Sequence, residues 1–139
     1  MQEAENTQII QDAYAAFLRG DAASVLAVVD ESVVWKATTG ASADVPMAGV
    51  RHGRGEVARF FQQVGEHITF SRFEPQSYVA QGDRVVALGH YTGTTSAGGG
   101  FDSDFVMIFT LRSGRIVEFQ EFLDVAQYNA AWATVAAVR

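Results

Sequence analysis

The chain has 139 residues, of which 48% are hydrophobic and 19% charged, proportions typical of a folded domain rather than a disordered segment. Sixteen acidic residues against ten lysines and arginines give a formal net charge of -6, which opposes binding to the phosphates of nucleic acid. The sequence contains no cysteine, so disulfides, thiolate nucleophiles and zinc–thiolate sites are excluded.

The length fits one domain, and because the chain shows no internal repeat we expect a single domain spanning residues 1–139. The first residues lack the basic and apolar pattern of a signal peptide, and no apolar run is long enough to cross a bilayer. The lack of cysteine also fits a reducing compartment. We therefore expect a cytoplasmic protein that binds neither nucleic acid nor membranes.

The first part of the chain predicts two helices and a strand. Apolar residues recur at helical spacing from Ile9 to Leu18, and Gly20 can take the left-handed conformation that often ends a helix. Asp21 is a favourable cap for a short second helix. The β-branched and aromatic side chains of residues 32–37 then predict a strand.

The middle of the chain predicts a loop and a third helix. Residues 38–53 show no regular period, and a long loop of this kind in a compact domain often borders a binding site. Helical spacing returns at Arg54, and we expect that helix to end at Gly65.

The second half of the chain predicts strands joined by short turns, which favours an antiparallel meander. Pro75 marks either a bulge or an edge position in the first of these strands. Residues 125–138 are rich in alanine and predict a terminal helix. The four expected strands are residues 68–80, 84–93, 105–111 and 115–124.

Helices that precede a meander predict an α+β fold. A twisted antiparallel sheet curves, and we expect it to wrap around the N-terminal helices. Where the helices do not cover its concave face, a cavity remains.

Four segments, taken together and in order, resemble a known family. They are Tyr14–Asp21, Gly53–Val57 followed by Phe60-Phe61, Gly82–Val86 and Gly114–Asp124. The resemblance is to the SnoaL-like branch of the NTF2-like superfamily, and it implies a cone-shaped α+β barrel and usually a homodimer packed through the sheet. The superfamily includes ketosteroid isomerases, limonene-epoxide hydrolases, polyketide cyclases and pocket proteins without assigned chemistry, so this fold does not fix a reaction.

The last expected strand carries a single acid on an otherwise apolar face. Successive side chains of a strand point to opposite sides, so Val117, Phe119, Glu121 and Leu123 share one face. This is the pattern of a pocket wall with one carboxyl group, whose pKa would be raised by burial. A bulge in the strand would turn Glu121 to the other face.

His90 is the expected partner of Glu121. On the second strand of the meander His90 shares a face with Leu88, and on the third strand Ser103 shares one with Phe105. The resemblance to limonene-epoxide hydrolases supports these faces, since His90 and Glu121 stand where those enzymes have two aspartates. It argues against their reaction, because Leu88 stands where they have an arginine. A histidine on a strand is equally well explained as a structural residue.

We therefore expect Glu121 and His90 to be the catalytic pair, and a mostly apolar set of residues to bind the ligand. The aromatic members of this set are also compatible with a role in the core. The expected ligand-binding residues are Trp35, Phe17, Phe61, Leu88, Ser103, Phe105, Phe119 and Leu123.

Two other polar residues are alternatives. Trp35 and Lys36 are neighbours, so only one of them can face the pocket. The resemblance to ketosteroid isomerases places their aspartate base near Lys36 and their tyrosine donor near Ala13 or Tyr14, so their known route is not expected. Asp124 resembles an aspartate used by SnoaL-like cyclases, and it is also well placed to cap the terminal helix.

A carboxyl and imidazole pair in an apolar pocket can take a proton from the carbon next to a carbonyl group and return it elsewhere. We expect an isomerase, dehydratase or aldol-type cyclase acting on a small apolar or cyclic carbonyl compound, with no cofactor and no metal. Two other interpretations stay open: a non-catalytic carrier or sensor, and a dimerisation or partner-docking module with a filled pocket. Val106, Ile108 and Phe122, expected on the outer sheet face, favour a homodimer.

Overall fold

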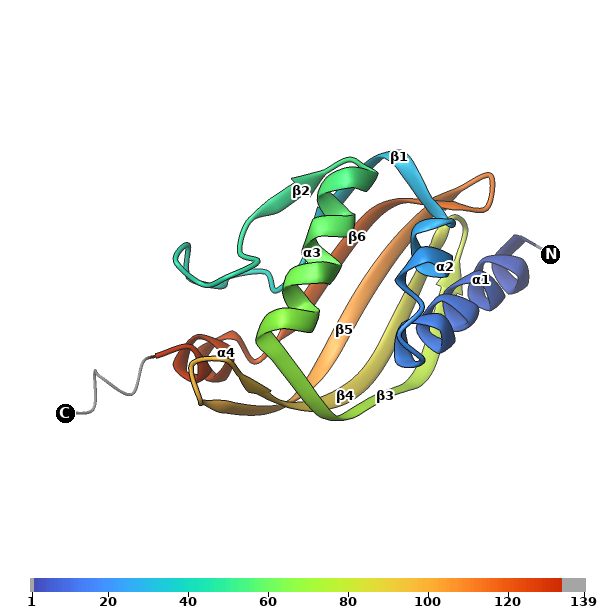
Figure 1. Cartoon of the computed structure of the whole chain (residues 1–139). Coiled ribbons are helices and arrows are strands. Elements are labelled where there is room, and N and C mark those ends of the chain that lie inside the picture. Colours follow the sequence, from blue (N-terminus) through green and yellow to red (C-terminus); the bar gives the residue numbers. More distant parts are fainter. Residues whose placement is uncertain (1, 134–139) are drawn as a thin grey trace.

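The computed structural model describes residues 2–133, which form four helices and six strands (Figure 1). In chain order the elements are α1 (Gln2–Leu18), α2 (Ala22–Leu26), β1 (Val29–Lys36), β2 (Val50–His52), α3 (Arg54–His67), β3 (Ile68–Gln81), β4 (Arg84–Thr95), β5 (Gly100–Arg112), β6 (Arg115–Leu123) and α4 (Val125–Ala131).

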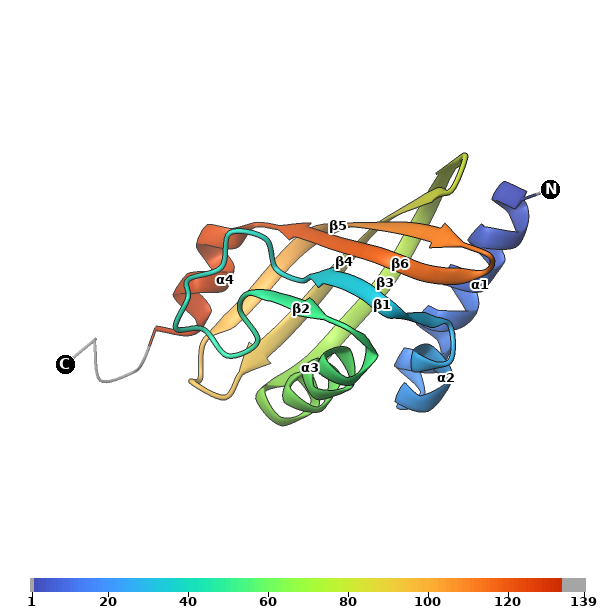
Figure 2. The same ribbon diagram turned by 90° about the horizontal axis from the view of Figure 1, so that it is seen from above.

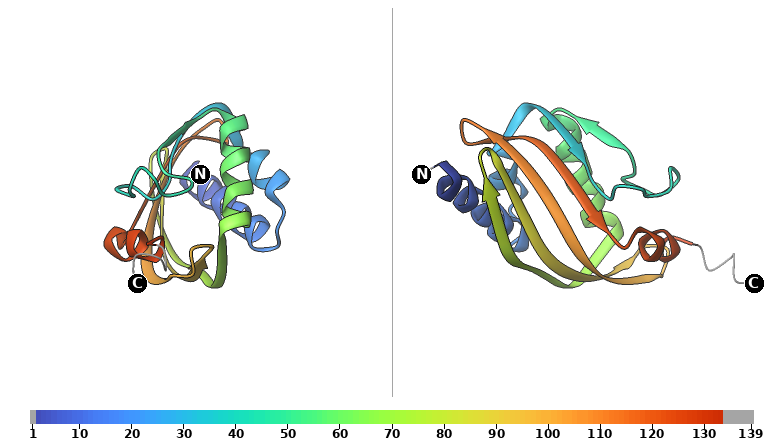
Figure 3. Two further views of the ribbon diagram at one scale, coloured as in Figure 1. Left: turned by 60° about the vertical axis from the view of Figure 1, so that its left-hand side comes forward. Right: turned by 180° about the vertical axis from the view of Figure 1, so that it is seen from behind.

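The six strands form one curved sheet in the order β2-β1-β6-β5-β4-β3. Neighbouring strands are antiparallel, except that β1 and β6 run parallel. Helices α1, α2 and α3 lie on the concave side, and α4 lies at one end of the strands (Figures 1 and 2). Seen from behind, β3 to β6 present an outer face that these helices leave uncovered (Figure 3). The expected α+β class and antiparallel meander are confirmed, in a cone that stays open between the edge strands β2 and β3.

Residues that were expected to end or cap helices do so at Gly20 and Asp21, but not at Gly65. After α1, Gly20 has a φ of 77°, and Asp21 caps α2 by accepting a hydrogen bond from the Ser24 backbone N–H at 3.1 Å. The expected end of α3 at Gly65 is wrong, because this glycine is not in the left-handed conformation and the helix continues past it. The helix ends where Ile68 takes an extended conformation and begins β3.

Three other features bear on the expected boundaries. The loop expected at residues 38–53 ends in the short strand β2, whose three residues are too few to show a pattern in the sequence. The terminal helix α4 ends at Ala131, so the expected helix does not include residues 132 and 133, and its remainder, residues 134–138, lies outside the described residues. Both expected roles of Pro75 are confirmed, since β3 is an edge strand and its register with β4 shifts between Pro75 and Ser77.

Strand β4 faces the opposite way from the expectation. Its buried, inward-facing side is the odd-numbered set that includes Gly89, Tyr91 and Gly93, while Leu88 and His90 lie on the outer side. Two of the inner positions are glycines and carry no side chain. In the sequence, the face with Leu88 therefore looks more apolar than the face that is in fact buried.

The two glycines make room for aromatic rings from β5. A Cβ atom at Gly89 would lie 2.4 Å from the carbonyl oxygen of Glu74 and 2.4 Å from Cζ of Phe105, and one at Gly93 would lie 2.6 Å from Cζ of Phe101. The absence of these Cβ atoms therefore lets an aromatic layer form directly against the β4 backbone on the concave side.

We expect Gly89→Ala to lower the free energy of unfolding by about 1–3 kcal/mol, because the added methyl group must displace both backbone and ring atoms. Urea unfolding followed by circular dichroism measures the change. Gly100→Ala is the matched control, since this strand glycine would place its Cβ no closer than 3.5 Å to another residue. Equal stability of the two variants would contradict the close packing at Gly89.

Candidate functional site

A cavity of about 100 Å³ lies between the concave face of the sheet and the helices. Its walls come from all four helices, from β1 and β3 to β6, and from the loop after β1, and most of the lining side chains are aromatic or aliphatic. Among the described lining residues Glu121 carries the only carboxyl group, and none is lysine, arginine or histidine. A single acid therefore faces an apolar space that has no basic side chain in its walls.

Strand β6 places Glu121 on the inner face, where it is only 6% exposed. Its Oε1 accepts a hydrogen bond from the backbone N–H of Thr38 at 3.0 Å, and its Oε2 accepts one from the hydroxyl of Tyr91 at 2.8 Å. Burial raises the pKa of Glu121 above its ordinary value of 4.5, while the two hydrogen bonds act in the opposite direction. Glu121 faces the cavity, as the strand alternation predicted.

Tyr91, in the middle of β4, orients Glu121 through the hydrogen bond from its hydroxyl. The centroid of its ring lies 4.8 Å from that of Phe105 and 5.6 Å from those of Phe101 and Phe73. Burial, and then the charge of Glu121, raises the pKa of Tyr91, so its hydroxyl is protonated at neutral pH and donates to the carboxyl group. The aromatic layer fixes this donor and, through it, the orientation of Glu121.

The loop after β1 is tied to Glu121 at two points. In addition to the bond from Thr38 to the side chain, the backbone N–H of Thr39 donates to the Glu121 carbonyl oxygen at 3.0 Å. Thr38 has a φ of 45°, which is uncommon for a β-branched residue and typical of backbone held in place at functional sites. Its Oγ1 is buried without a hydrogen-bond partner among the described residues, so a ligand or water is left to pair with it.

A second hydroxyl in the lining, that of Tyr14 on α1, has a weak partner. It donates to the sulfur of Met107 at 2.9 Å, and a thioether is a poor acceptor. Burial, and then the charge of Glu121, raises the pKa of Tyr14, so this hydroxyl is also protonated at neutral pH. Tyr14 can therefore redirect its hydrogen to an oxygen atom of a bound molecule at little cost.

Several residues expected to bind a ligand do line the cavity. Trp35 stacks on Phe119 with 4.0 Å between the ring centroids, and the alternation of β1 turns Lys36 to the other side. Of these two neighbours, Trp35 is therefore the one that faces inward. The expected residues found in the lining are Phe17, Trp35, Phe61, Phe119 and Glu121.

Three other expected residues are not part of the lining: Ser103, Phe105 and Leu123. Phe105 packs behind Tyr91, and Ser103 Oγ accepts a hydrogen bond from the Asp124 backbone N–H at 2.9 Å. The Asp124 side chain in turn accepts a hydrogen bond at 3.2 Å from a backbone N–H in the first turn of α4. Asp124 is thus a helix cap, the second of the two roles that its position suggested.

His90 and Leu88 lie on the outer face of the sheet, so the expectation that they face the cavity is wrong. The His90 ring contacts Asp104 through Nδ1 at 2.8 Å and Asp102 through Nε2. The hydrogen bonds that the His90 ring donates to Asp104 and Asp102 raise the pKa of His90 above 6.5. His90 belongs to an ion-pair cluster across β4 and β5 rather than to a pair with Glu121.

Tyr91 and Thr38 were missed from the sequence. Tyr91 does carry a signal, because Gly89 and Gly93 share its face and mark a strand that approaches other groups closely. Thr38 carries none, since it reaches Glu121 through a backbone N–H in an irregular loop.

Within residues 2–133, no three His, Asp or Glu side chains gather as metal ligands do. The same part of the chain contains no helix that is both long and apolar enough to cross a membrane.

Comparison with known proteins shows which family has this architecture. A family model of the SnoaL-like domain matches residues 10–119. An NTF2-like protein from Burkholderia xenovorans LB400 is 32% identical, with a TM-score of 0.82 over 93% of this chain and 96% of that one. An NTF2-like protein of unknown function from Burkholderia pseudomallei K96243 is 30% identical, with a TM-score of 0.84 over 94% of this chain and 98% of that one.

A more distant structure shares the fold. It is TerC, crystallised with polyporic acid, which is 23% identical with a TM-score of 0.79 over 94% of this chain and 99% of that one. No protein with a curated description matches the chain. The family match over most of the chain and the agreement in fold confirm the resemblance seen in the sequence motifs, and the chain belongs to the SnoaL-like family of NTF2-like proteins.

Proposed function

We propose that the protein is a cofactor-independent acid/base catalyst, an isomerase, dehydratase or cyclase that acts on a small apolar or cyclic carbonyl compound. The observation that carries this proposal is the Glu121 carboxyl group, which is buried at the wall of an aromatic cavity without a basic side chain beside it. Burial raises the pKa of this carboxyl group and so increases its affinity for a proton, and a carboxyl group can both accept and return a proton during a reaction. Membership of the SnoaL-like family, whose fold polyketide cyclases also have, is consistent with this chemistry.

In the proposed reaction Glu121, as the carboxylate, removes a proton from the carbon next to the carbonyl group of the substrate. The electron pair of the broken C–H bond moves into an enolate, and the negative charge gathers on the carbonyl oxygen. Glu121 then returns the proton at a different carbon in an isomerisation. In an aldol-type cyclisation the enolate instead attacks a second carbonyl carbon of the same molecule, and the new alkoxide takes the proton.

The enolate oxygen needs a hydrogen-bond donor, and Tyr14 supplies one in this proposal. Its hydroxyl lines the cavity and exchanges a thioether for an oxyanion, a far better acceptor. Its raised pKa keeps the hydrogen on Tyr14 while the substrate is free.

Tyr91 and Thr38 act as positioning residues. Each donates to one oxygen of Glu121, so the carboxylate keeps a fixed direction and leaves its remaining lone pairs free. Their hydrogen bonds also offset part of the effect of burial on the pKa of Glu121, and so favour the carboxylate, which is the form that acts as the base.

Exchange of hydrogen for deuterium tests the proposal without knowledge of the natural substrate. We expect the protein to accelerate exchange of the α-protons of cyclic ketones such as 4-methylcyclohexanone in D₂O, measured by proton NMR. Because the base must be ionised, the rate should rise with pH through a midpoint above 4.5. Glu121→Gln should slow the exchange by about 10²–10⁴-fold, the usual contribution of a general base.

His90→Gln is the control for this experiment, since His90 lies on the outer face and should leave the rate unchanged. If the Glu121→Gln variant keeps its fold and catalyses ketone proton exchange as fast as the original protein, the proposed reaction is refuted. Tight ketone binding with no exchange in the original protein would favour the carrier or sensor interpretation.

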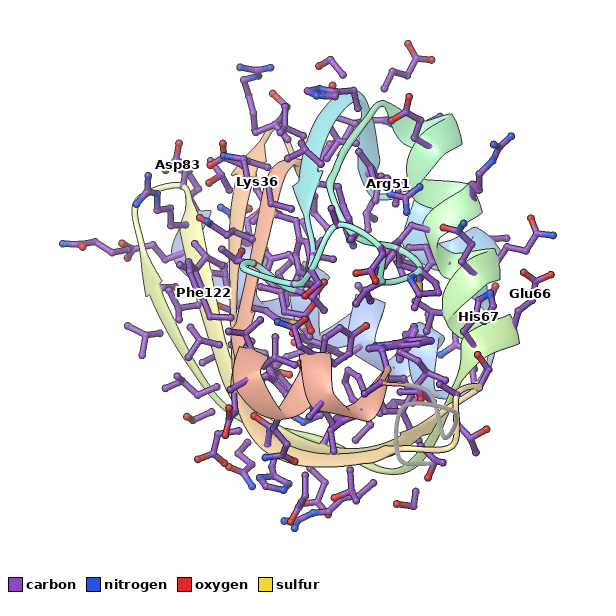
Figure 4. The ribbon with its side chains drawn as sticks, turned by 90° about the vertical axis from the view of Figure 1, so that its left-hand side faces the viewer. Lys36, Arg51, Glu66, His67, Asp83 and Phe122 are labelled. Carbon is purple, nitrogen blue, oxygen red and sulfur yellow. The ribbon has the colours of Figure 1, made fainter. Side chains whose placement is uncertain are left out.

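We also propose that two copies pair through the outer face of the sheet. Leu88, Val106 and Phe122 lie opposite one another on β4, β5 and β6, and Leu88 and Phe122 are 37% and 39% exposed. Phe122 lies on the side of the sheet away from α3 (Figure 4). Burying this apolar row against a second copy would stabilise a dimer.

Analytical ultracentrifugation tests the pairing. We expect a dimer that Phe122→Glu converts to monomer, because a charge in the centre of an apolar contact is costly to bury. Purely monomeric behaviour of the original protein at high concentration would refute the dimer.

The cytoplasmic location and the absence of nucleic-acid partners stay predictions from the sequence.

A further inference from the structure

A groove of about 500 Å³ lies beside the cavity, between the end of α1, the start of α2, the end of α3 and the first half of β3. The groove falls within the range of small-molecule sites, roughly 300–1,000 Å³, whereas the cavity next to Glu121 is smaller than that range. Leu18 lines this groove and is 53% exposed, so it offers apolar surface to a bound molecule.

The groove and the cavity share one wall. The side chains that line both are Phe17, Phe61, Val64, Ile68, Phe70 and Phe73. Each of the six is half-buried, so a single layer of apolar side chains separates the cavity from the solvent-facing groove. The ring centroids of Phe17 and Phe61 lie 6.0 Å apart across this layer, on α1 and α3.

The charges at the outer end of the groove disfavour an anionic ligand. Arg72 lies there, but its guanidinium is paired with Glu74 at 2.8 Å. Asp102 and Asp104 also act on Arg72 from β5. Arg72 is the only charged residue among the described residues that line the groove, and its charge is already paired, so a neutral apolar group fits better than an anion.

We propose that the groove is a second binding subsite for the same ligand. The ligand is an elongated, uncharged molecule: its carbonyl-bearing ring lies in the cavity at Glu121, and its apolar extension crosses the shared wall into the groove by displacing the rings of Phe17 and Phe61. Phe17 and Phe61 are then the residues that select for the extension. The carbonyl group assigned to the ligand rests on the proposed function. The apolar extension assigned to it rests on the wall that the cavity and the groove share.

Gly65 offers a way to fill the groove without touching the cavity. It lines the groove and not the cavity, and a Cβ atom built on it meets nothing within 4 Å, so a larger side chain can be accommodated. Gly55 is a matched control on the same helix, because it also has open space at its Cβ and is exposed, yet it lines neither space.

The experiment compares 4-methylcyclohexanone with 4-hexylcyclohexanone, with Kd measured by calorimetry on the full chain. Each methylene buried in the groove should tighten binding about two- to fourfold, so the hexyl compound should bind at least about tenfold more tightly. Gly65→Leu should remove most of this preference and leave the methyl compound unchanged. Gly55→Leu should keep the preference, which excludes a general attraction of the alkyl chain to the protein surface.

Three results would overturn the subsite: equal affinity for the two ketones, a preference that survives in Gly65→Leu, or failure of both ketones to bind. The α-proton exchange of the same two ketones separates this inference from the proposed function. A Gly65-dependent preference without exchange keeps the subsite and refutes the catalysis. Exchange of both ketones without a length preference keeps the catalysis and refutes the subsite.

Discussion

The burial of one carboxyl group, that of Glu121, is the constraint around which the site is arranged. Taking a carboxylate out of water costs several kcal/mol unless hydrogen bonds replace the lost hydration. Tyr91 and Thr38 provide those bonds, and each depends on a different part of the fold. Tyr91 is held by the aromatic layer of the concave face, and Thr38 donates from a loop whose backbone is left-handed at this residue. The loop, the layer and the last long strand therefore meet at one side chain.

The same arrangement sets up the chemistry. Burial favours the protonated form of Glu121, whereas the two hydrogen bonds favour the carboxylate, so burial and hydrogen bonding act on its pKa in opposite directions. The absence of lysine, arginine and histidine from the described lining means that no fixed positive charge traps it as an anion. The NTF2-like fold carries many different sites. The reaction proposed for this chain therefore depends on the polar groups in its cavity, Glu121 with the hydroxyls of Tyr91 and Tyr14, rather than on the shape of the sheet.

Much of the fold could be predicted from the sequence, because helical periodicity, short turns and the position of Pro75 are local signals. The face of Glu121 could be predicted as well, since β6 alternates regularly around it. The face of β4 could not, because Gly89 and Gly93 leave the inner side without the side chains that periodicity counts. That single reversal placed His90 at the site in place of its neighbour Tyr91. The role of Thr38 depends on the path of a loop, and side-chain pattern carries no information about it.

The raised proton affinity of Glu121 is the central claim, and it can be measured at the atom concerned. Carbon-13 NMR of the labelled glutamate carboxyl groups, with the Glu121 signal assigned by its loss in Glu121→Gln, follows this group through a pH titration. We expect a midpoint above 4.5. Because the folded chain then binds this proton more tightly than the unfolded chain, Glu121 should also make stability fall as the pH rises from 4.5 through that midpoint. A midpoint at or below 4.5 would show that burial does not raise the proton affinity of Glu121 and would contradict the central claim.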